Sequence, residues 1–252
     1  MLSVLSPITV FNEAFRRVRE NPAGFLPWAL LLVVNEILYY WGYLAFGPLH
    51  EYSTPLTFAA IFIGYPVAFF AVMNRTLAAG SAEPISLLFR GRFWKFLFAL
   101  AALTAIGKMI FVILFLTSSE ILTAFEDGHF VVFGQTFFMA MACYGVMARL
   151  SLVLPPISIG KNYDYYASWQ MARGYLYSIL STFIPYAVAG IAMASVSQPL
   201  DGSAISRPLL FACCVLTGGV GFFTLAAYTV WYEKLAELRD EAQHEENAGR
   251  AA

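Results

Sequence analysis

Charged side chains are scarce in this sequence of 252 residues. Asp, Glu, Lys and Arg make up 12% of it and hydrophobic residues 60%, whereas about a quarter of a typical soluble domain is charged. The formal net charge of −1 also excludes a globally basic protein, so no nucleic-acid partner is expected. The composition predicts an integral membrane protein, in which the placement of the charges matters more than their sum.

Cysteine, histidine and the usual catalytic signatures are also few or missing. The three cysteines, Cys143, Cys213 and Cys214, all lie in apolar runs, so no disulfide framework is predicted. The sequence has no H-E-x-x-H zinc motif, no P-loop and no G-x-S-x-G nucleophile elbow. No histidine lies within a predicted membrane span. These absences predict a protein that is not an enzyme and that has no cofactor and no metal.

Six apolar runs are long enough to cross a bilayer as helices, and they cover residues 23–45, 56–79, 96–117, 130–154, 177–197 and 208–232. A crossing takes about 20 residues. The predicted fold is therefore an all-α polytopic membrane protein with six transmembrane helices. Because that number is even, both termini are expected on the same side of the membrane.

Basic residues are distributed unevenly between the two predicted sides. The segments 46–55, 118–129 and 198–207 hold only Arg207, whereas thirteen basic residues lie on the other side and Lys108 lies within a span. In bacterial membrane proteins the cytoplasmic segments carry the excess of Lys and Arg. We therefore expect a multi-pass protein of the bacterial inner membrane with both termini in the cytoplasm. Residues 233–252 are then a charged cytoplasmic tail.

Residues 1–22 predict an amphipathic helix in the cytoplasmic interface, ahead of a membrane domain over residues 23–232. Ser6 is suited to cap this helix and Pro7 to occupy its first position. Arg16, Arg17 and Arg19 lie mostly away from the apolar side chains. The predicted apolar face consists of Ile8, Phe11, Phe15 and Val18.

Similar interfacial helices are predicted near residues 83–95 and 161–176. Aligning Arg16, Arg90 and Arg173 gives spacings of 74 and 83 residues. This suggests three repeats, each an interfacial helix followed by a helical hairpin. The alternative is that short cytoplasmic loops of such proteins are in general rich in Arg and aromatic residues.

The segment between the fourth and fifth spans is expected to lie flat on the cytoplasmic surface. Pro155 and Pro156 should end the fourth span, because neither supplies a backbone N–H to a helix. Trp169 is expected to anchor the following aromatic segment at the headgroup boundary. Gly174 should then let the chain turn back into the membrane.

The same segment resembles a known family. "RLSLVLPPISIG" followed by "SWQMARG" is similar to the pattern of bacterial six-span proteins that include the membrane domain attached to some glycerophosphodiester phosphodiesterases. Arg149, Pro155, Trp169, Arg173 and Gly174 occupy the corresponding positions. The resemblance implies a six-span fold in a bacterial membrane. It implies no hydrolysis, since nothing outside the spans is long enough to fold as a phosphodiesterase domain.

Two charged residues are predicted at the same depth within the membrane. Glu36 and Lys108 each lie about 20 Å along their spans from the cytoplasmic edge, with Asn35 beside Glu36. An ion pair between them would offset much of the cost of burying each charge. The pair is interpreted either as a structural contact that fixes helix register or as a polar site for an ion, proton or headgroup.

Four arginines near the cytoplasmic side are candidate contacts for an anionic lipid, and they are Arg90, Arg92, Arg149 and Arg173. The default interpretation is that each binds lipid headgroups separately. A sharper hypothesis is that they line one cytoplasmic pocket for an anionic lipid. A further alternative is that Arg149 pairs with Asp164 or Glu233.

The sequence thus favours a non-catalytic scaffold, regulator or lipid-associated accessory factor of the cell envelope. Membrane lipids are the expected partners, with a second membrane protein as a further candidate. The alternative function is a transporter of small solutes, ions or lipids that uses the polar site around Glu36 and Lys108. Three parallel repeats fit that alternative poorly, because the best-known transporters use inverted repeats.

Overall fold

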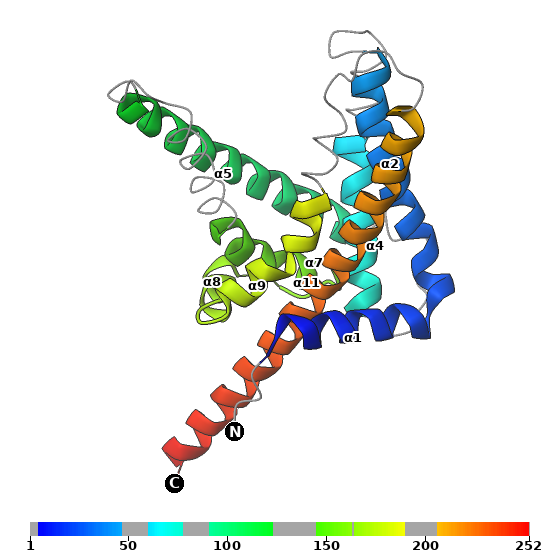
Figure 1. The fold of residues 1–252 in the computed structure, drawn as a ribbon. Helices are drawn as coiled ribbons and strands as arrows, with labels where there is room; N and C mark the ends of the chain where they lie inside the picture. Colours follow the sequence, from blue (N-terminus) through cyan, green and yellow to red (C-terminus); the bar gives the residue numbers. More distant parts are fainter. Residues whose placement is uncertain are drawn as a thin grey trace.

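The computed structural model describes residues 5–46, 60–77, 91–122, 145–162, 164–189 and 206–251, and the elements in these ranges are helices (Figure 1). The elements are α1 (Pro7–Glu20), α2 (Pro22–Phe46), the π-helix η1 (Ala60–Gly64), α4 (Tyr65–Leu77), α5 (Gly91–Leu122), the 3-10 turn η3 (Ser151–Val153), α7 (Leu154–Ser158), α8 (Tyr165–Met171), α9 (Leu176–Thr182) and α11 (Ser206–Ala251). The all-α prediction is confirmed for these ranges.

Three described helices are long and apolar enough to cross a membrane, and their windows are Pro22–Tyr39, Gly91–Ile110 and Pro208–His244. They belong to α2, α5 and α11. Two shorter apolar helices cover Gly145–Ser158 and Leu176–Ala189. The six-span count stays a prediction, because the runs predicted at 56–79, 130–154 and 177–197 extend beyond the described residues.

The helix α1 begins as the sequence predicts. The Ser6 side chain accepts a hydrogen bond from the backbone N–H of Thr9 at 3.2 Å, and Pro7 stands in the first turn. Such a cap satisfies a backbone donor that the helix itself leaves unpaired. The predicted start of the helix is therefore confirmed.

The packing of α1 differs from the single apolar face that was predicted. Val10 and Ala14 are fully buried against the bundle, whereas Ile8 and Phe15 of the predicted face are 73% and 56% exposed. The helix therefore has an inner face, an exposed apolar face and a charged face that includes Arg16. An exposed apolar face beside a charged one is the pattern of an interfacial helix.

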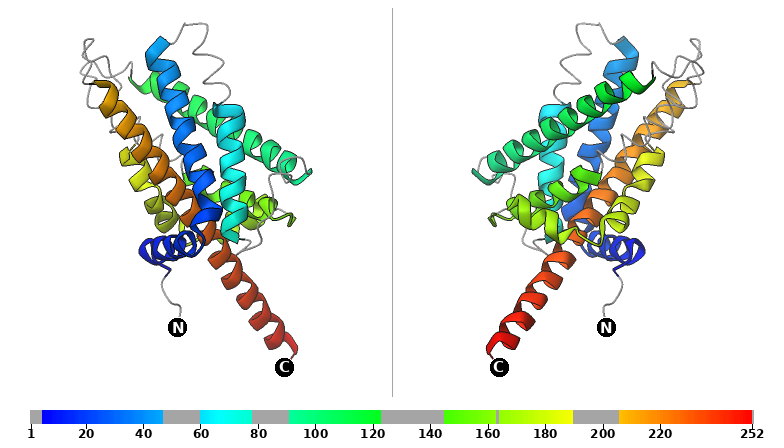
Figure 2. Two further views of the ribbon diagram at one scale, coloured as in Figure 1. Left: turned by 90° about the vertical axis from the view of Figure 1, so that its right-hand side faces the viewer. Right: turned by 90° about the vertical axis from the view of Figure 1, so that its left-hand side faces the viewer.

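The centre of the molecule is formed by α2, α4 and α11, which pack along one another (Figures 1 and 2). Close approach of α2 and α11 depends on Gly218, where an added Cβ would lie 2.7 Å from Cα of Val33. Small residues permit such backbone contact between membrane helices. Beyond the bundle, the end of α11 projects on the same side as α1 (Figure 2).

The helix α5 diverges from this centre (Figure 1). Its first turns are held by an aromatic cluster in which Phe70 of α4 contacts Phe93 and Phe96, with ring centroids 5.5 and 5.3 Å apart. Farther along, Gly107 faces the side chain of Met147. The helix α5 therefore packs against Gly145–Ser158, and its other side is exposed.

The prediction that Pro155 and Pro156 end a helix is wrong. The chain is helical from Gly145 to Ser158, and both prolines are buried in α7. The turn before them tightens to the 3-10 form of η3, and the prolines fall in the first turn of α7, where a missing N–H is tolerated. After α8, Gly174 adopts a positive φ of 91° before α9, so its predicted role as a turn is confirmed.

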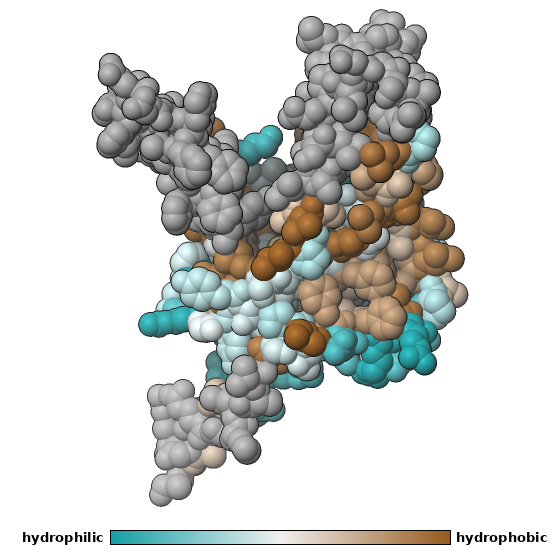
Figure 3. Space-filling view, in the orientation of Figure 1, coloured by the Kyte–Doolittle hydropathy of each residue, from teal (hydrophilic) through white to brown (hydrophobic). Residues whose placement is uncertain are grey.

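The surface divides into an apolar and a polar part. In Figure 3 hydrophobic side chains cover much of the described surface of the bundle, and hydrophilic ones gather over α1 at its lower edge. Such a division is expected of a protein whose bundle lies in hydrocarbon and whose α1 lies at the water boundary. The threefold repeat stays a prediction, because its second interfacial segment lies largely outside the described residues.

Candidate functional site

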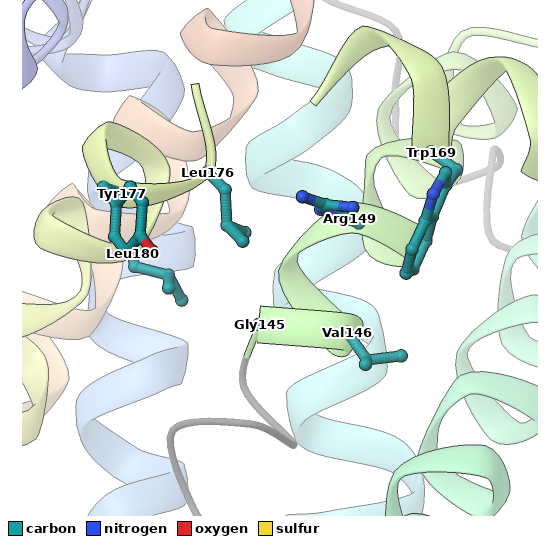
Figure 4. Close-up of a pocket in the computed structure, with 7 residues that line it drawn as sticks. All are labelled: Gly145, Val146, Arg149, Trp169, Leu176, Tyr177 and Leu180. Carbon is teal, nitrogen blue, oxygen red and sulfur yellow. The ribbon is translucent and has the colours of Figure 1, made fainter. Parts of the chain in front are cut away.

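Arg149 and Trp169 meet in a pocket on one side of the bundle (Figure 4). The guanidinium carbon of Arg149 lies 4.6 Å from the ring centroid of Trp169, which is a cation–π contact. The cavity has a volume of about 320 Å³ and is lined by Gly145, Val146, Arg149, Trp169, Leu176, Tyr177 and Leu180. Arg149 is the charged member of an otherwise apolar and aromatic lining.

The pocket is assembled because α8 turns back over the end of the Gly145–Ser158 helix. The hydroxyl of Ser168 in α8 donates a hydrogen bond to the backbone carbonyl of Arg149. The sequence separation of 19 residues between them is bridged by the turn at Gly160, which has a positive φ of 77°. Trp169 follows Ser168 directly and is thereby brought over the Arg149 side chain.

The long helix α11 supports the same wall of the pocket. The hydroxyl of Tyr228 lies 2.7 Å from Oγ of Ser151 and 3.3 Å from the carbonyl oxygen of Ala148. Because the 3-10 turn η3 interrupts the regular helical ladder here, side-chain hydroxyls from α8 and α11 bind these carbonyls. The backbone beside Arg149 is therefore held from both sides.

Neither acidic residue suggested for Arg149 binds it. Asp164 caps α8 by accepting a hydrogen bond from the N–H of Tyr166 at 2.9 Å, and Glu233 binds Arg17. Within the described residues no carboxylate forms an ion pair with Arg149, and its Nε is buried without a hydrogen-bond partner. The pocket is thus lined by a guanidinium that no described carboxylate neutralises.

The other predicted arginines do not join Arg149 in this pocket. Arg92 is exposed, and its guanidinium covers Gly160, where an added Cβ would lie 2.5 Å from Nε of Arg92. Arg173 is exposed in the turn after α8. Arg90 lies outside the described residues. Neither Arg92 nor Arg173 is among the residues that line the Arg149 pocket, and the shared binding of an anionic lipid by these arginines stays a prediction.

A second polar cluster joins α1 to α4 and α11, and sequence reasoning missed it. Arg17 donates to the carbonyl oxygen of Thr76 and to Glu13, both at 2.8 Å, and it also binds Glu233. It therefore ties α1 to the end of α4 and to the interior of α11. The spacing of Glu13 and Arg17 was a signal for their pairing, but no local pattern indicates Glu233.

Hydrogen bonds to these arginines set the ionisation of Glu13. The guanidinium of Arg16, and next to it that of Arg17, holds the pKa of Glu13 down at about 2. In return, the bond to Glu13 raises the pKa of Arg16 above its usual value. Glu13 therefore stays ionised at any pH near neutrality.

The ion pair predicted between Glu36 and Lys108 is not formed. Glu36 is 4% exposed in the core of the bundle, where the Tyr186 hydroxyl lies 3.4 Å from its Oε1, whereas Lys108 is exposed on α5. The physical reason is the divergence of α5, which packs on the Gly145–Ser158 helix rather than beside Glu36. Asn35, which precedes Glu36 in the sequence, is also buried.

Comparisons with known proteins found no matching family model, no matching curated protein and no matching solved structure. The resemblance to six-span proteins with an attached phosphodiesterase therefore stays a prediction.

Proposed function

We propose that this chain is a non-catalytic, lipid-associated protein of the bacterial inner membrane, and that its Arg149 pocket binds the headgroup of an anionic lipid. The observation that carries this proposal is the guanidinium of Arg149, stacked on Trp169 with a buried and unpaired Nε. Arginine binds phosphate oxygens with short, charge-assisted hydrogen bonds. A phosphodiester in the pocket would supply the missing negative charge and accept hydrogen bonds from the guanidinium.

The rest of the lining favours a lipid over a free anion. Val146, Leu176 and Leu180 are apolar, and Tyr177 at the rim is 86% exposed. A volume of about 320 Å³ lies at the lower end of the range for ligand pockets. It suits a headgroup with the first part of an acyl chain, since an apolar wall gains from hydrocarbon and not from water.

The same proposal includes the predicted topology. With α1 in the cytoplasmic interface and both termini in the cytoplasm, the pocket opens towards the inner leaflet, which carries anionic lipids. The scaffold or regulator role follows if the bound lipid controls how the protein associates with a second membrane protein. The alternative function, transport, required a polar site formed by Glu36 and Lys108, and Lys108 does not lie beside Glu36.

The test is native mass spectrometry of the full-length protein with phosphatidylglycerol and phosphatidylcholine. We expect the wild type to retain phosphatidylglycerol preferentially. Arg149→Gln should bind it at least about tenfold more weakly, because a hydrogen bond to a charged group contributes roughly 1.5–3 kcal/mol. Arg173→Gln is the matched control, since it removes an equal charge from an exposed turn outside the pocket. Equal retention by wild type and Arg149→Gln would contradict the proposal.

A further inference from the structure

Glu36 is a carboxylate deep in a membrane-spanning helix that has no basic partner. It lies fourteen residues beyond Pro22, which is about 20 Å along α2, and it is 4% exposed. Within the described residues no Lys or Arg forms an ion pair with it. A single uncompensated charge at such a depth is costly, and such residues often mark ion or proton paths.

Groups from three elements face Glu36. The hydroxyl of Tyr186, from the helical segment 184–189, lies 3.4 Å from Oε1 of Glu36, and Tyr65 at the start of α4 also hydrogen-bonds the carboxylate. Sγ of Cys214 in α11 lies 3.9 Å from the backbone carbonyl oxygen of Glu36. These are the titratable groups that face Glu36 in the described part of the chain. They solvate a carboxylate but carry no positive charge to compensate it.

Asn35 places an amide whose Nδ2 has no hydrogen-bond partner at the edge of the same cluster. The residue is 2% exposed. Its side chain lies against Gly64, where an added Cβ would come within 1.9 Å of Oδ1 of Asn35. Because Gly64 directly precedes Tyr65, the amide borders the point where Tyr65 meets Glu36. A buried polar atom without a partner is one sign of an ion or water site.

The backbone beside this cluster departs from a regular helix. The π-helix η1 covers Ala60–Gly64 and ends at the glycine that contacts Asn35. Pro66 follows in the next turn and has no backbone N–H to donate. Short π-helical turns occur frequently at functional sites. The irregular turn and the polar cluster therefore coincide.

We propose that Glu36, Tyr65, Tyr186 and Asn35 form an intramembrane site for a monovalent cation, either a proton or Na⁺. One positive charge neutralises the single carboxylate, whereas a divalent ion would leave a surplus charge in the bundle. The hydroxyls and the Asn35 amide oxygen, once the amide rotates, supply the oxygen ligands that hard cations prefer. No residue of this site lines the Arg149 pocket, so the two proposals stand independently.

The test uses the full-length protein in phosphatidylcholine nanodiscs. Dicyclohexylcarbodiimide, an apolar reagent, adds to protonated carboxylic acids and leaves an adduct that peptide mass spectrometry locates. Labelling of Glu36 is followed over a series of pH values in NaCl and in choline chloride. Glu36→Gln is the control for the adduct. Thermal unfolding of the wild type and of Glu36→Gln is measured under the same conditions.

Two results would support the proposal and identify the cation. Labelling that falls with rising pH and is the same in both salts indicates a proton. Labelling that NaCl suppresses, together with a higher unfolding temperature of the wild type but not of Glu36→Gln, indicates Na⁺. In Tyr186→Phe, labelling of Glu36 should persist to higher pH. The substitution removes a hydroxyl that donates a hydrogen bond to the ionised carboxylate, so the protonated form that reacts is favoured.

The thermal measurement tests the proposed site even if the reagent does not reach Glu36. An occupied cation site makes the stability of the wild type depend on pH or NaCl in a way that Glu36→Gln does not share. An identical dependence in both proteins, with Glu36 unlabelled, would overturn the proposal. So would labelling of Glu36 that changes with neither pH nor NaCl.

Discussion

Single polar side chains fix the positions of apolar helices in this protein. Trp231 of α11 is fully buried and donates from Nε1 to Oγ1 of Thr182 in α9 at 2.8 Å. The hydroxyl of Tyr228, one turn earlier, shares a hydrogen bond of 2.7 Å with Oγ of Ser151. A buried polar atom left without its partner costs roughly 1–3 kcal/mol. If a neighbouring helix shifted along α11, such a pair would break and leave a buried polar atom without a partner. The pairs therefore fix the positions of these helices, including those that form the Arg149 pocket.

The acidic limit of stability is set in part by Glu13. Its folded-state pKa of about 2 lies below its ordinary value of 4.5, so the unfolded chain binds more protons at Glu13 between these values. The carboxylate therefore stabilises the fold fully above about pH 4.5, and this stabilisation is lost as the pH falls through about 2. The unfolding temperature in detergent should be lower for Glu13→Gln than for the wild type at neutral pH, and the gap should close on acidification.

Glu20→Gln provides the control for this experiment. Glu20 pairs only with Arg16 among the described residues, and its side chain is 59% exposed, against 22% for Glu13. Exposed ion pairs of this kind contribute little, so its loss should hardly change the unfolding temperature at any pH. A gap between Glu13→Gln and the wild type that persists unchanged in strong acid would show that packing, rather than charge, accounts for the effect of Glu13.

At the scale of elements, the contact of α2 with α11 rests on one of two adjacent glycines. An added Cβ at Gly218 would meet the Cα and N of Val33 at 2.7 and 3.0 Å, and backbone atoms cannot rotate away. An added Cβ at Gly219 would meet no atom within 4 Å. Gly218→Ala should therefore destabilise the protein by about 1–3 kcal/mol, as overpacking does. Gly219→Ala should leave stability unchanged or raise it, since Ala favours helix.

Unfolding of the two variants in mixed detergent measures this difference directly. Both substitutions add one methyl group to the same turn of α11, so any general effect on insertion or helix propensity cancels in the comparison. Equal stability of the two variants would mean that α2 and α11 do not approach each other as closely as the structure has them.

Sequence patterns within a few residues predicted where helices and turns occur better than which elements contact one another. The cap at Ser6 and Pro7 and the turn at Gly174 follow from side chains within a few residues, and the structure has them as expected. Pro155 and Pro156 were misinterpreted because proline is unfavourable inside a helix but suitable in its first turn. Here the 3-10 turn η3 precedes the two prolines, so they lie in the first turn of a new helix and not inside an existing one.

The candidate sites depend on contacts that the sequence pattern does not contain. Trp169 reaches Arg149 because the chain reverses at Gly160, and hydropathy gives no information about such a reversal. The predicted ion pair between Glu36 and Lys108 rests only on their equal depth in the membrane. Depth ranks residues along the membrane normal but does not say which helices are neighbours, and α5 packs elsewhere.

At the scale of the whole molecule, α1 and the projecting end of α11 lie at the same end of the bundle (Figure 2). Arg17 of α1 binds Glu233 in the interior of α11. The exposed apolar side chains Ile8 and Phe15 need hydrocarbon, whereas the charged face of α1 needs water. Both needs are met only at a membrane boundary, and the basic residues on this side favour the cytoplasmic one.

Labelling of introduced cysteines tests this orientation. Asn12 and Gln243 are exposed on α1 and on the end of α11, so Asn12→Cys and Gln243→Cys, made in a chain with Cys143, Cys213 and Cys214 replaced by Ala, report on the two ends. In intact spheroplasts a membrane-impermeant maleimide should label neither, and permeabilisation should expose both. Ser203→Cys, in the predicted external segment 198–207, should react without permeabilisation. Labelling of only one end in intact spheroplasts would place Asn12 and Gln243 on opposite faces of the membrane. That result would contradict the contact of α1 with α11 through Arg17. The assignment of the Arg149 pocket to the cytoplasmic side would then be wrong as well.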